Sequence, residues 1–253
     1  MLTFTDAQVL AWITPILWPF IRVLALFSTL PVIAQTSVPA RVRIGLAFVV
    51  AFCAQATIPA IEPIELASAA GALAVAQQVV IGLSLGFAAR LVITAVEFAG
   101  EIVGLQMGLN FASFFNPMTG GDETAVSRFY GVAVAWLFIV SGGHLMLIGA
   151  VVQSFTAFPV SSEPFSFLRT VQPQRWGAEI FSTGLWIALP IVAMLLFAHL
   201  VLGIISRVAQ QMNIFAIGFP ITVGVGLVGV LLTLPMLQMP FTMALERMLS
   251  HFQ

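Results

Sequence analysis

Long apolar segments separated by short connections constrain the fold of this chain more than any other feature. Hydrophobic residues make up 60% of its 253 residues and charged residues only 8%, whereas soluble globular proteins carry roughly 25% charged residues. A membrane-spanning helix needs about 20 apolar residues, and the period-two alternation of a β-barrel is absent. We therefore predict an all-α membrane protein with long kinked helices and helical hairpins. The prediction rests on six long apolar segments: Ala7–Ala34, Ile44–Ala60, Leu66–Val96, Phe129–Val160, Ile180–Ser206 and Ile214–Leu245.

Charges in the connections predict how the chain is oriented in the membrane. Arg41 and Arg43 lie in the clearest basic connection, and the positive-inside rule places such a connection on the cytoplasmic side. The next connection contains Glu62 and Glu65 and would be external. Strict alternation then predicts a cytoplasmic position for residues 104–124 and 203–220, provided that every segment crosses the bilayer completely.

The connection at residues 104–124 is unusual because it is apolar. It reads GLQMGLNFASFFNPMTGGDET, and its only acids stand at the far end. Burying such a segment is favourable, so we predict that it packs inside a protein assembly or inside a pore. We also expect Asp122, Glu123 and Thr124 to cap the helix that follows, since acids and threonine favour a helix N-terminus.

Glycines recur at every fourth position leading into this connection, at Gly100, Gly104 and Gly108. Gly82 and Gly86 have the same spacing further upstream. Glycines four apart lie on one face of a helix and leave a groove in which another helix backbone can come close. Glycine is common in membrane helices generally, but three in succession favour tight helix packing.

Four charged residues lie within or beside the apolar segments, where charge is costly unless it is paired, faces water or lies at an interface. One hypothesis is a set of buried structural ion pairs, at a subunit interface. The equal numbers of basic and acidic groups favour it, because such charges can cancel. The alternative is a secondary transporter in which Arg90, Glu97 and Glu101 form a coupling site. The four residues are Arg22, Arg90, Glu97 and Glu101.

The sequence contains no recognisable enzyme constellation: HExxH and Walker motifs are both absent. His144, His199 and His251 lack the spacing of metal ligands, and Cys53 is the single cysteine. The net charge of −1 gives no reason to expect a nucleic-acid partner. We therefore expect neither catalysis nor a cofactor or metal.

Two stretches resemble the signatures of the FliR family of type III secretion export-gate subunits, which serve flagella and virulence injectisomes. GLQMGLNFASFFNPMTGG at 104–121 is similar to the central signature. LGIISRVAQQMNIFAIGFP at 202–220 is similar to the second, with a Ser-Arg pair, Gln-x-Asn-x-Phe and Gly-Phe-Pro. Length and segment order agree over essentially the whole chain. Gln210 departs from the proline of most members, which leaves the geometry of this turn open.

The resemblance implies a non-enzymatic subunit of the bacterial inner membrane, at the flagellar basal body. It implies one copy assembled with several FliP-type and FliQ-type subunits around a protein-conducting channel, with an FlhB-type subunit at the cytoplasmic entrance. Unfolded exported proteins would be the substrates. It further implies one subunit with a FliP-like part, about residues 1–179, and a FliQ-like helical hairpin, about residues 180–245. Between the flagellar and virulence systems we favour the flagellar one.

The resemblance also implies specific sites. A plug at about residues 110–122 would close the channel at rest, in place of the cytoplasmic position that alternation predicts. Aromatic side chains and an adaptable methionine can seal a narrow lumen by contact and dewetting. The plug residues are Phe111, Phe114, Phe115, Asn116, Pro117, Met118, Gly120 and Gly121. The cytoplasmic entrance turn comprises Arg207, Gln211, Asn213, Phe215, Gly218 and Pro220.

Overall fold

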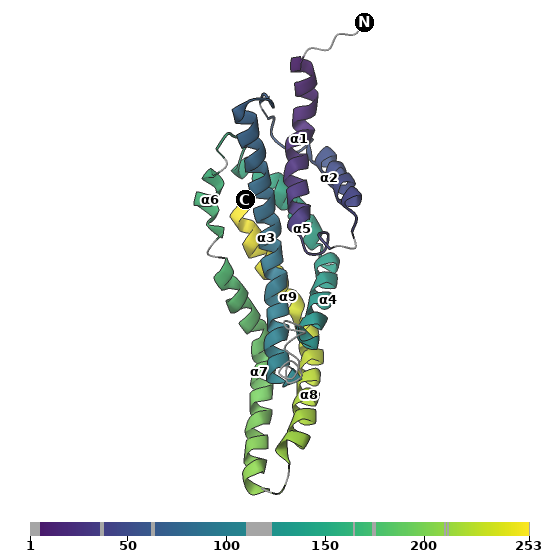
Figure 1. Cartoon of the computed structure of the whole chain (residues 1–253), viewed down its shortest axis with the longest axis vertical. Helices are drawn as coiled ribbons and strands as arrows, with labels where there is room; N and C mark the ends of the chain where they lie inside the picture. The colour runs from purple at the N-terminus through teal and green to yellow at the C-terminus, as the bar shows by residue number, and fades with distance from the viewer. Residues whose placement is uncertain are drawn as a thin grey trace, which may run out of the picture. The chain divides into compact units, whose positions relative to one another are not determined.

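The computed structural model describes residues 6–35, 38–61, 64–109, 123–163, 165–173, 176–209, 211 and 213–252. Within these residues every regular secondary-structure element is a helix, which confirms the predicted all-α fold (Figure 1). The helices are α1 (Asp6–Thr29), α2 (Ala40–Ala54), α3 (Ala69–Gln106), α4 (Ala125–Val140), α5 (Gly143–Ala157), α6 (Ser166–Val171), α7 (Gly177–Val208), α8 (Ile214–Thr233) and α9 (Gln238–Leu249), with 3-10 helices η4 (Leu234–Leu237) and η5 (Ser250–Phe252).

The chain forms two compact units, and each is assembled from separate stretches of sequence. Residues 1–91, 142–176 and 245–253 make the first unit, and residues 92–141 and 177–244 make the second. Helix α3 contributes to both, as does α9. The predicted FliP-like and FliQ-like parts, residues 1–179 and 180–245, are two consecutive stretches and do not correspond to these units. They describe a resemblance to other subunits, and that resemblance stays a prediction.

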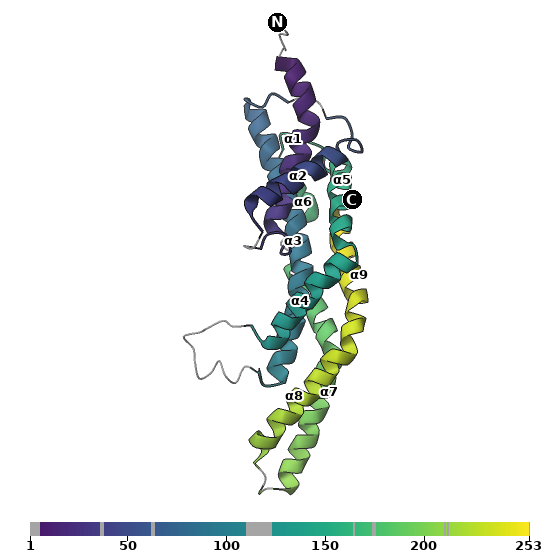
Figure 2. The same cartoon turned by 90° about the vertical axis from the view of Figure 1, so that its right-hand side faces the viewer.

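In the first unit, α1 packs on α2 and on the first part of α3. Figure 2 shows α1 and α2 crossing. The buried residues of α2 are all alanines, Ala47, Ala51 and Ala54, so little side-chain volume separates the two helices. Where α1 meets α3, a Cβ atom placed on Gly86 would lie 2.7 Å from the carbonyl oxygen of Leu26. The small residues of α2 and α3 therefore bring three helices to close range.

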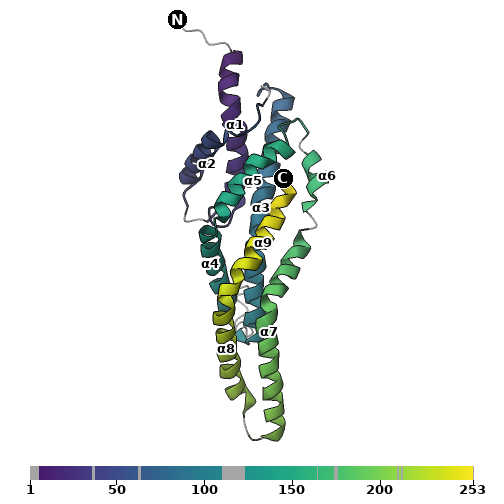
Figure 3. The same ribbon diagram turned by 180° about the vertical axis from the view of Figure 1, so that it is seen from behind.

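In the second unit, α7 and α8 form a helical hairpin. They run side by side and join through a short connection, as Figures 1 and 3 show. A Cβ atom on Gly229 would lie 3.1 Å from Cγ2 of Ile191, so α8 packs closely on α7. A Cβ atom on Gly184 would lie 2.7 Å from the carbonyl oxygen of Ala95, which brings α7 equally close to the second part of α3.

The helices divide the apolar segments differently from the prediction. Among the described residues, four stretches are long and apolar enough to span a membrane, at 12–29, 69–106, 177–208 and 216–252. The pair α4 and α5 makes a fifth if it is counted as one span. The predicted fourth segment is broken because Gly142 adopts a left-handed conformation, with φ 74°. The second segment yields only the 15 residues of α2, too few for a straight span.

Candidate functional site at the base of the central loop

The eight predicted plug residues fall within 110–122 and lie outside the described residues, so their prediction stays a prediction. The structure does describe the two ends from which this central loop starts and to which it returns. One end is the C-terminus of α3 and the other is the N-terminus of α4. Both belong to the second unit. Their geometry decides how firmly the loop is anchored.

The return end is fixed by a helix cap that α3 completes. Thr124 is the N-cap of α4, and its Oγ1 accepts a hydrogen bond of 3.1 Å from the backbone N–H of Ser127. The backbone N–H of Thr124 donates to Oε2 of Glu101 at 3.0 Å. Ser127 Oγ donates to the carbonyl oxygen of Glu97 at 3.0 Å. The structure thus confirms the predicted cap at Thr124 and shows Glu101 taking part in it.

The glycines of α3 leave no room between α3 and α4. A Cβ atom on Gly104 would lie 2.5 Å from Thr124 Oγ1, and one on Gly100 would lie 2.7 Å from Ser127 Cα. Real Cβ atoms do not come this close, so glycine is required at both places for α4 to dock as it does. Gly108 differs, because its φ of 81° ends α3 in a left-handed turn.

The departure end is held against α8. Met107 follows the last residue of α3 and is only 1% exposed. The hydroxyl of Thr222 lies 3.2 Å from the Met107 carbonyl oxygen. The Met107 side chain occupies the space beside Gly226, where a Cβ atom would lie 2.5 Å from Met107 Sδ. Both ends of the central loop are therefore packed against neighbouring helices.

An apolar pocket of about 450 Å³ adjoins both ends of the loop. Leu109 lines it from the departure end and Ala125 from the return end, while Leu227 and Val230 line it from α8. None of its lining side chains is charged. The pocket offers apolar contact next to the loop and no chemical group for catalysis.

A second candidate lies in the first unit, around the completely buried Arg22. Its Nε donates to Oε1 of Gln78 at 2.8 Å, and its Nη1 donates to Oγ of Ser154 at 2.7 Å. Its Nη2 donates to the carbonyl oxygen of Phe158 at 3.1 Å. The Cζ atom also lies 3.6 Å from the centroid of the Phe155 ring. The guanidinium is thus enclosed by neutral hydrogen-bond acceptors and an aromatic face.

The hydrogen bonds continue beyond Arg22 through two glutamines. Gln78 Nε2 donates to Oε1 of Gln77 at 2.9 Å, and Gln77 Nε2 donates to Oγ of Ser161 at 2.9 Å. Because α1, α3 and the connection after α5 all contribute, this network ties together three separate stretches of the first unit. Within the part of the chain that the structure describes, the hydrogen bonds of this network join no acidic side chain to a basic one, so the network is a structural arrangement.

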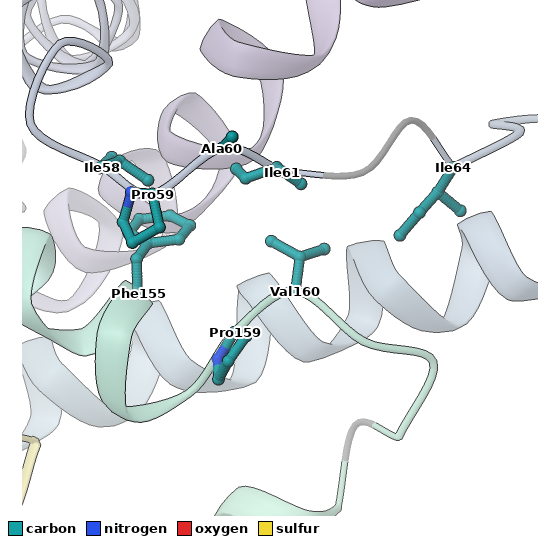
Figure 4. A pocket seen from close by; sticks show the side chains of 8 residues that line it. All are labelled: Ile58, Pro59, Ala60, Ile61, Ile64, Phe155, Pro159 and Val160. Atoms are coloured by element: carbon teal, nitrogen blue, oxygen red, sulfur yellow. The ribbon is translucent and has the colours of Figure 1, made fainter.

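An apolar pocket of about 280 Å³ adjoins this network. Figure 4 shows the eight lining side chains, which come from two stretches of the chain: Ile58, Pro59, Ala60, Ile61 and Ile64 on one side and Phe155, Pro159 and Val160 on the other. Phe155 therefore contacts the Arg22 guanidinium and also lines the pocket. All eight lining residues are apolar, so this pocket too lacks a group that could act in catalysis.

The four charged residues predicted as an ion-pair set have different surroundings. The described partners of Arg22 are neutral, which differs from the charge cancellation expected for it. Arg90 is exposed, whereas Glu97 and Glu101 are half-buried. Glu101 accepts the hydrogen bond from the Thr124 backbone. Arg22 and Glu101 thus have structural tasks, and their place at a subunit interface stays a prediction.

The predicted entrance turn is the connection between α7 and α8. Arg207 lies in the last turn of α7, and Asn213 caps α8 by accepting a hydrogen bond of 3.4 Å from the Ala216 N–H. Gln211 is exposed in the turn, and Phe215, Gly218 and Pro220 belong to α8. The predicted residues therefore lie in the turn and in the adjoining ends of α7 and α8, while their role as an entrance stays a prediction.

Sequence reasoning missed several residues that complete the two candidate sites. Gln77, Gln78 and Ser154 bind around Arg22, and Thr222 and Gly226 hold Met107. A signal existed for the first group, since polar residues are uncommon within such apolar segments. Gly226 is one of several glycines in α8, and the sequence does not distinguish it. Among the described residues, no group of three potential metal ligands is found.

Comparison with known proteins matches nearly the whole chain. A family model described as bacterial export proteins, family 1, matches residues 13–248. The flagellar biosynthetic protein FliR of Pectobacterium carotovorum subsp. carotovorum is 39% identical over 237 residues, covering 94% of this chain and 90% of that protein. FliR of Escherichia coli (strain K12) is 40% identical over 227 residues, covering 90% and 87%. FliR of Bacillus subtilis (strain 168) is 32% identical over 218 residues, covering 83% and 82%.

Proposed function

The chain belongs to family 1 of the bacterial export proteins, a membrane component of flagellar export, and from this membership we propose that it is a subunit of the type III secretion export gate. In this proposal it acts without catalysis and lines a protein-conducting channel together with FliP-type and FliQ-type subunits. It lies in the bacterial inner membrane at the flagellar basal body, and an FlhB-type subunit contacts its entrance turn. Unfolded flagellar proteins are the substrates.

We further propose that the central loop, residues 110–122, is the plug of this channel. The observation that carries the proposal is the anchoring of both loop ends, by Glu101 and Thr124 on one side and by Met107 and Thr222 on the other. A plug must withstand a driving force across the membrane, and an apolar loop on fixed ends meets that need. The sequence of the loop adds the bulk, because it contains three phenylalanines and a methionine.

The test measures the ion leak of the assembled gate. Deleting Phe114–Gly121 should open the resting channel to ions, while the subunit still co-purifies with its FliP-type and FliQ-type partners. A matched variant replaces the same eight residues by glycine and serine. It keeps the length of the loop and removes its bulk, so it should leak as well. An intact seal in both variants would overturn the plug proposal.

The transporter alternative has less support from the geometry. Glu101, one of the three residues of the coupling site in that hypothesis, accepts a hydrogen bond from the Thr124 backbone. A coupling site needs groups that change their protonation or binding state during transport. Glu101 instead connects α3 to the N-cap of α4. Solute uptake by the protein alone in liposomes would favour the transporter hypothesis over the export gate.

A further inference from the structure

The contact between Met107 and α8 is formed by the backbone and by the side chain of the same residue. Thr222 and Gly226 stand four residues apart and so share one face of α8. The Thr222 hydroxyl lies 3.2 Å from the Met107 carbonyl oxygen and 3.0 Å from that of Phe219, so its single proton is shared between the two. Met107 Cγ and Sδ each lie 2.5 Å from the Cβ position of Gly226.

The contact is specific to one position of α8. Gly224 lies two residues before Gly226, yet a Cβ atom there would meet nothing within 4 Å. The space at Gly226 is filled by Met107 alone among the nearest atoms, with Cγ, Sδ and Cε all within 2.8 Å of the Cβ position. A flexible thioether side chain is suited to filling such a notch without strain.

The place of Met107 in the chain gives this contact its significance. It is followed by Gly108, whose left-handed conformation turns the chain away from the axis of α3. Whatever fixes Met107 therefore fixes the point and the direction in which the central loop begins. The contact partner, α8, is also one arm of the hairpin that carries the predicted entrance turn.

We propose that Met107, seated in the notch at Gly226, is the positioning residue that ties the start of the central loop to the α7–α8 hairpin. This inference rests on the proposed function, because it assigns to Met107 the task of holding a plug in register. A shift of α8 at Gly226 displaces Met107, and with it the point from which the loop starts. The hairpin thereby influences the seal without touching the substrate.

The first experiment detects the contact itself and does not depend on export. Met107 is buried, whereas Met236 and Met239 are 71% and 74% exposed and serve as internal references. In the assembled gate, Gly226→Ala should displace the Met107 side chain and raise its oxidation by peroxide roughly tenfold, read by mass spectrometry. Gly224→Ala, on the same helix, should leave Met107 protected. Equal oxidation of Met107 in both variants would overturn the inference.

The second experiment connects the contact to the seal. Gly226→Ala should raise the resting ion leak several-fold at unchanged assembly, and Met107→Ala combined with Gly226→Ala should restore much of the seal, since the shorter side chain gives back the lost space. A purely structural role would lower assembly and leave the leak per gate unchanged. The loop deletion is measured alongside. If the Phe114–Gly121 deletion leaks but Gly226→Ala leaks no more than Gly224→Ala, Met107 does not position the loop. If the deletion does not leak, the plug proposal fails instead.

Discussion

The surroundings of Arg22 and the base of the central loop hold helices together by opposite means. Around Arg22 the helices are held together by hydrogen bonds from one guanidinium to several polar groups, so the contact depends on the presence of those groups. At the loop base, Thr124 packs against Gly104 and Met107 packs against Gly226. These contacts are possible only because the glycines have no Cβ atom. The contact around Arg22 should be weakened when a hydrogen-bond partner is removed, and the contact at the loop base should be weakened when a methyl group is added.

Removal of a partner at Arg22 should have the largest effect on stability. Gln78→Leu leaves the Nε donor of a completely buried guanidinium without its acceptor. Leaving a buried charged group unsatisfied costs roughly 3 kcal/mol or more. Denaturant unfolding in detergent measures the loss. Gln238→Leu, at an exposed position, is the matched control and should change little.

Addition of a methyl group at the loop base should have an intermediate effect. Gly104→Ala places a Cβ atom 2.5 Å from Thr124 Oγ1, and overpacking of this kind costs about 1–3 kcal/mol. Gly203→Ala, in α7, has nothing within 4 Å of the new Cβ atom, and it should gain about 0.5–1 kcal/mol from helix propensity. If unfolding shows the same change for both variants, the contact at the loop base does not depend on the missing methyl group of Gly104.

Loss of the helix cap should have the smallest effect of the three. Thr124→Ala removes the acceptor for the Ser127 N–H, and loss of an N-cap costs about 1 kcal/mol. Thr124→Ser keeps the hydroxyl and should retain most of the stability. Thermal unfolding of the two variants side by side tests this, and a serine variant as unstable as the alanine variant would point to lost methyl packing instead of the cap.

The sequence predicted the parts of the fold that depend on local pattern. Long apolar runs became long helices, and Thr124 caps α4 as its position after an acidic pair suggested. The partners of Arg22 could not be predicted, because Gln78 lies 56 residues away and Ser154 lies 132 residues away. Nor could the sequence show that α3 continues through Gly100 and Gly104 to Gln106, since the surrounding helices compensate for the poor helix propensity of glycine.

The length of α3 has a consequence for where this protein can reside. The helix has 38 residues, which at about 1.5 Å per residue gives a rod of about 57 Å. A bilayer supplies hydrocarbon over only about 30 Å. If α3 stood upright in the bilayer, almost half of its length would extend beyond the hydrocarbon. In its most apolar window, 67% of the residues are already buried by the rest of the chain. The apolar residues of α3 that lie beyond the hydrocarbon must be covered by protein. A lipid bilayer alone therefore does not bury all of the apolar surface of this subunit.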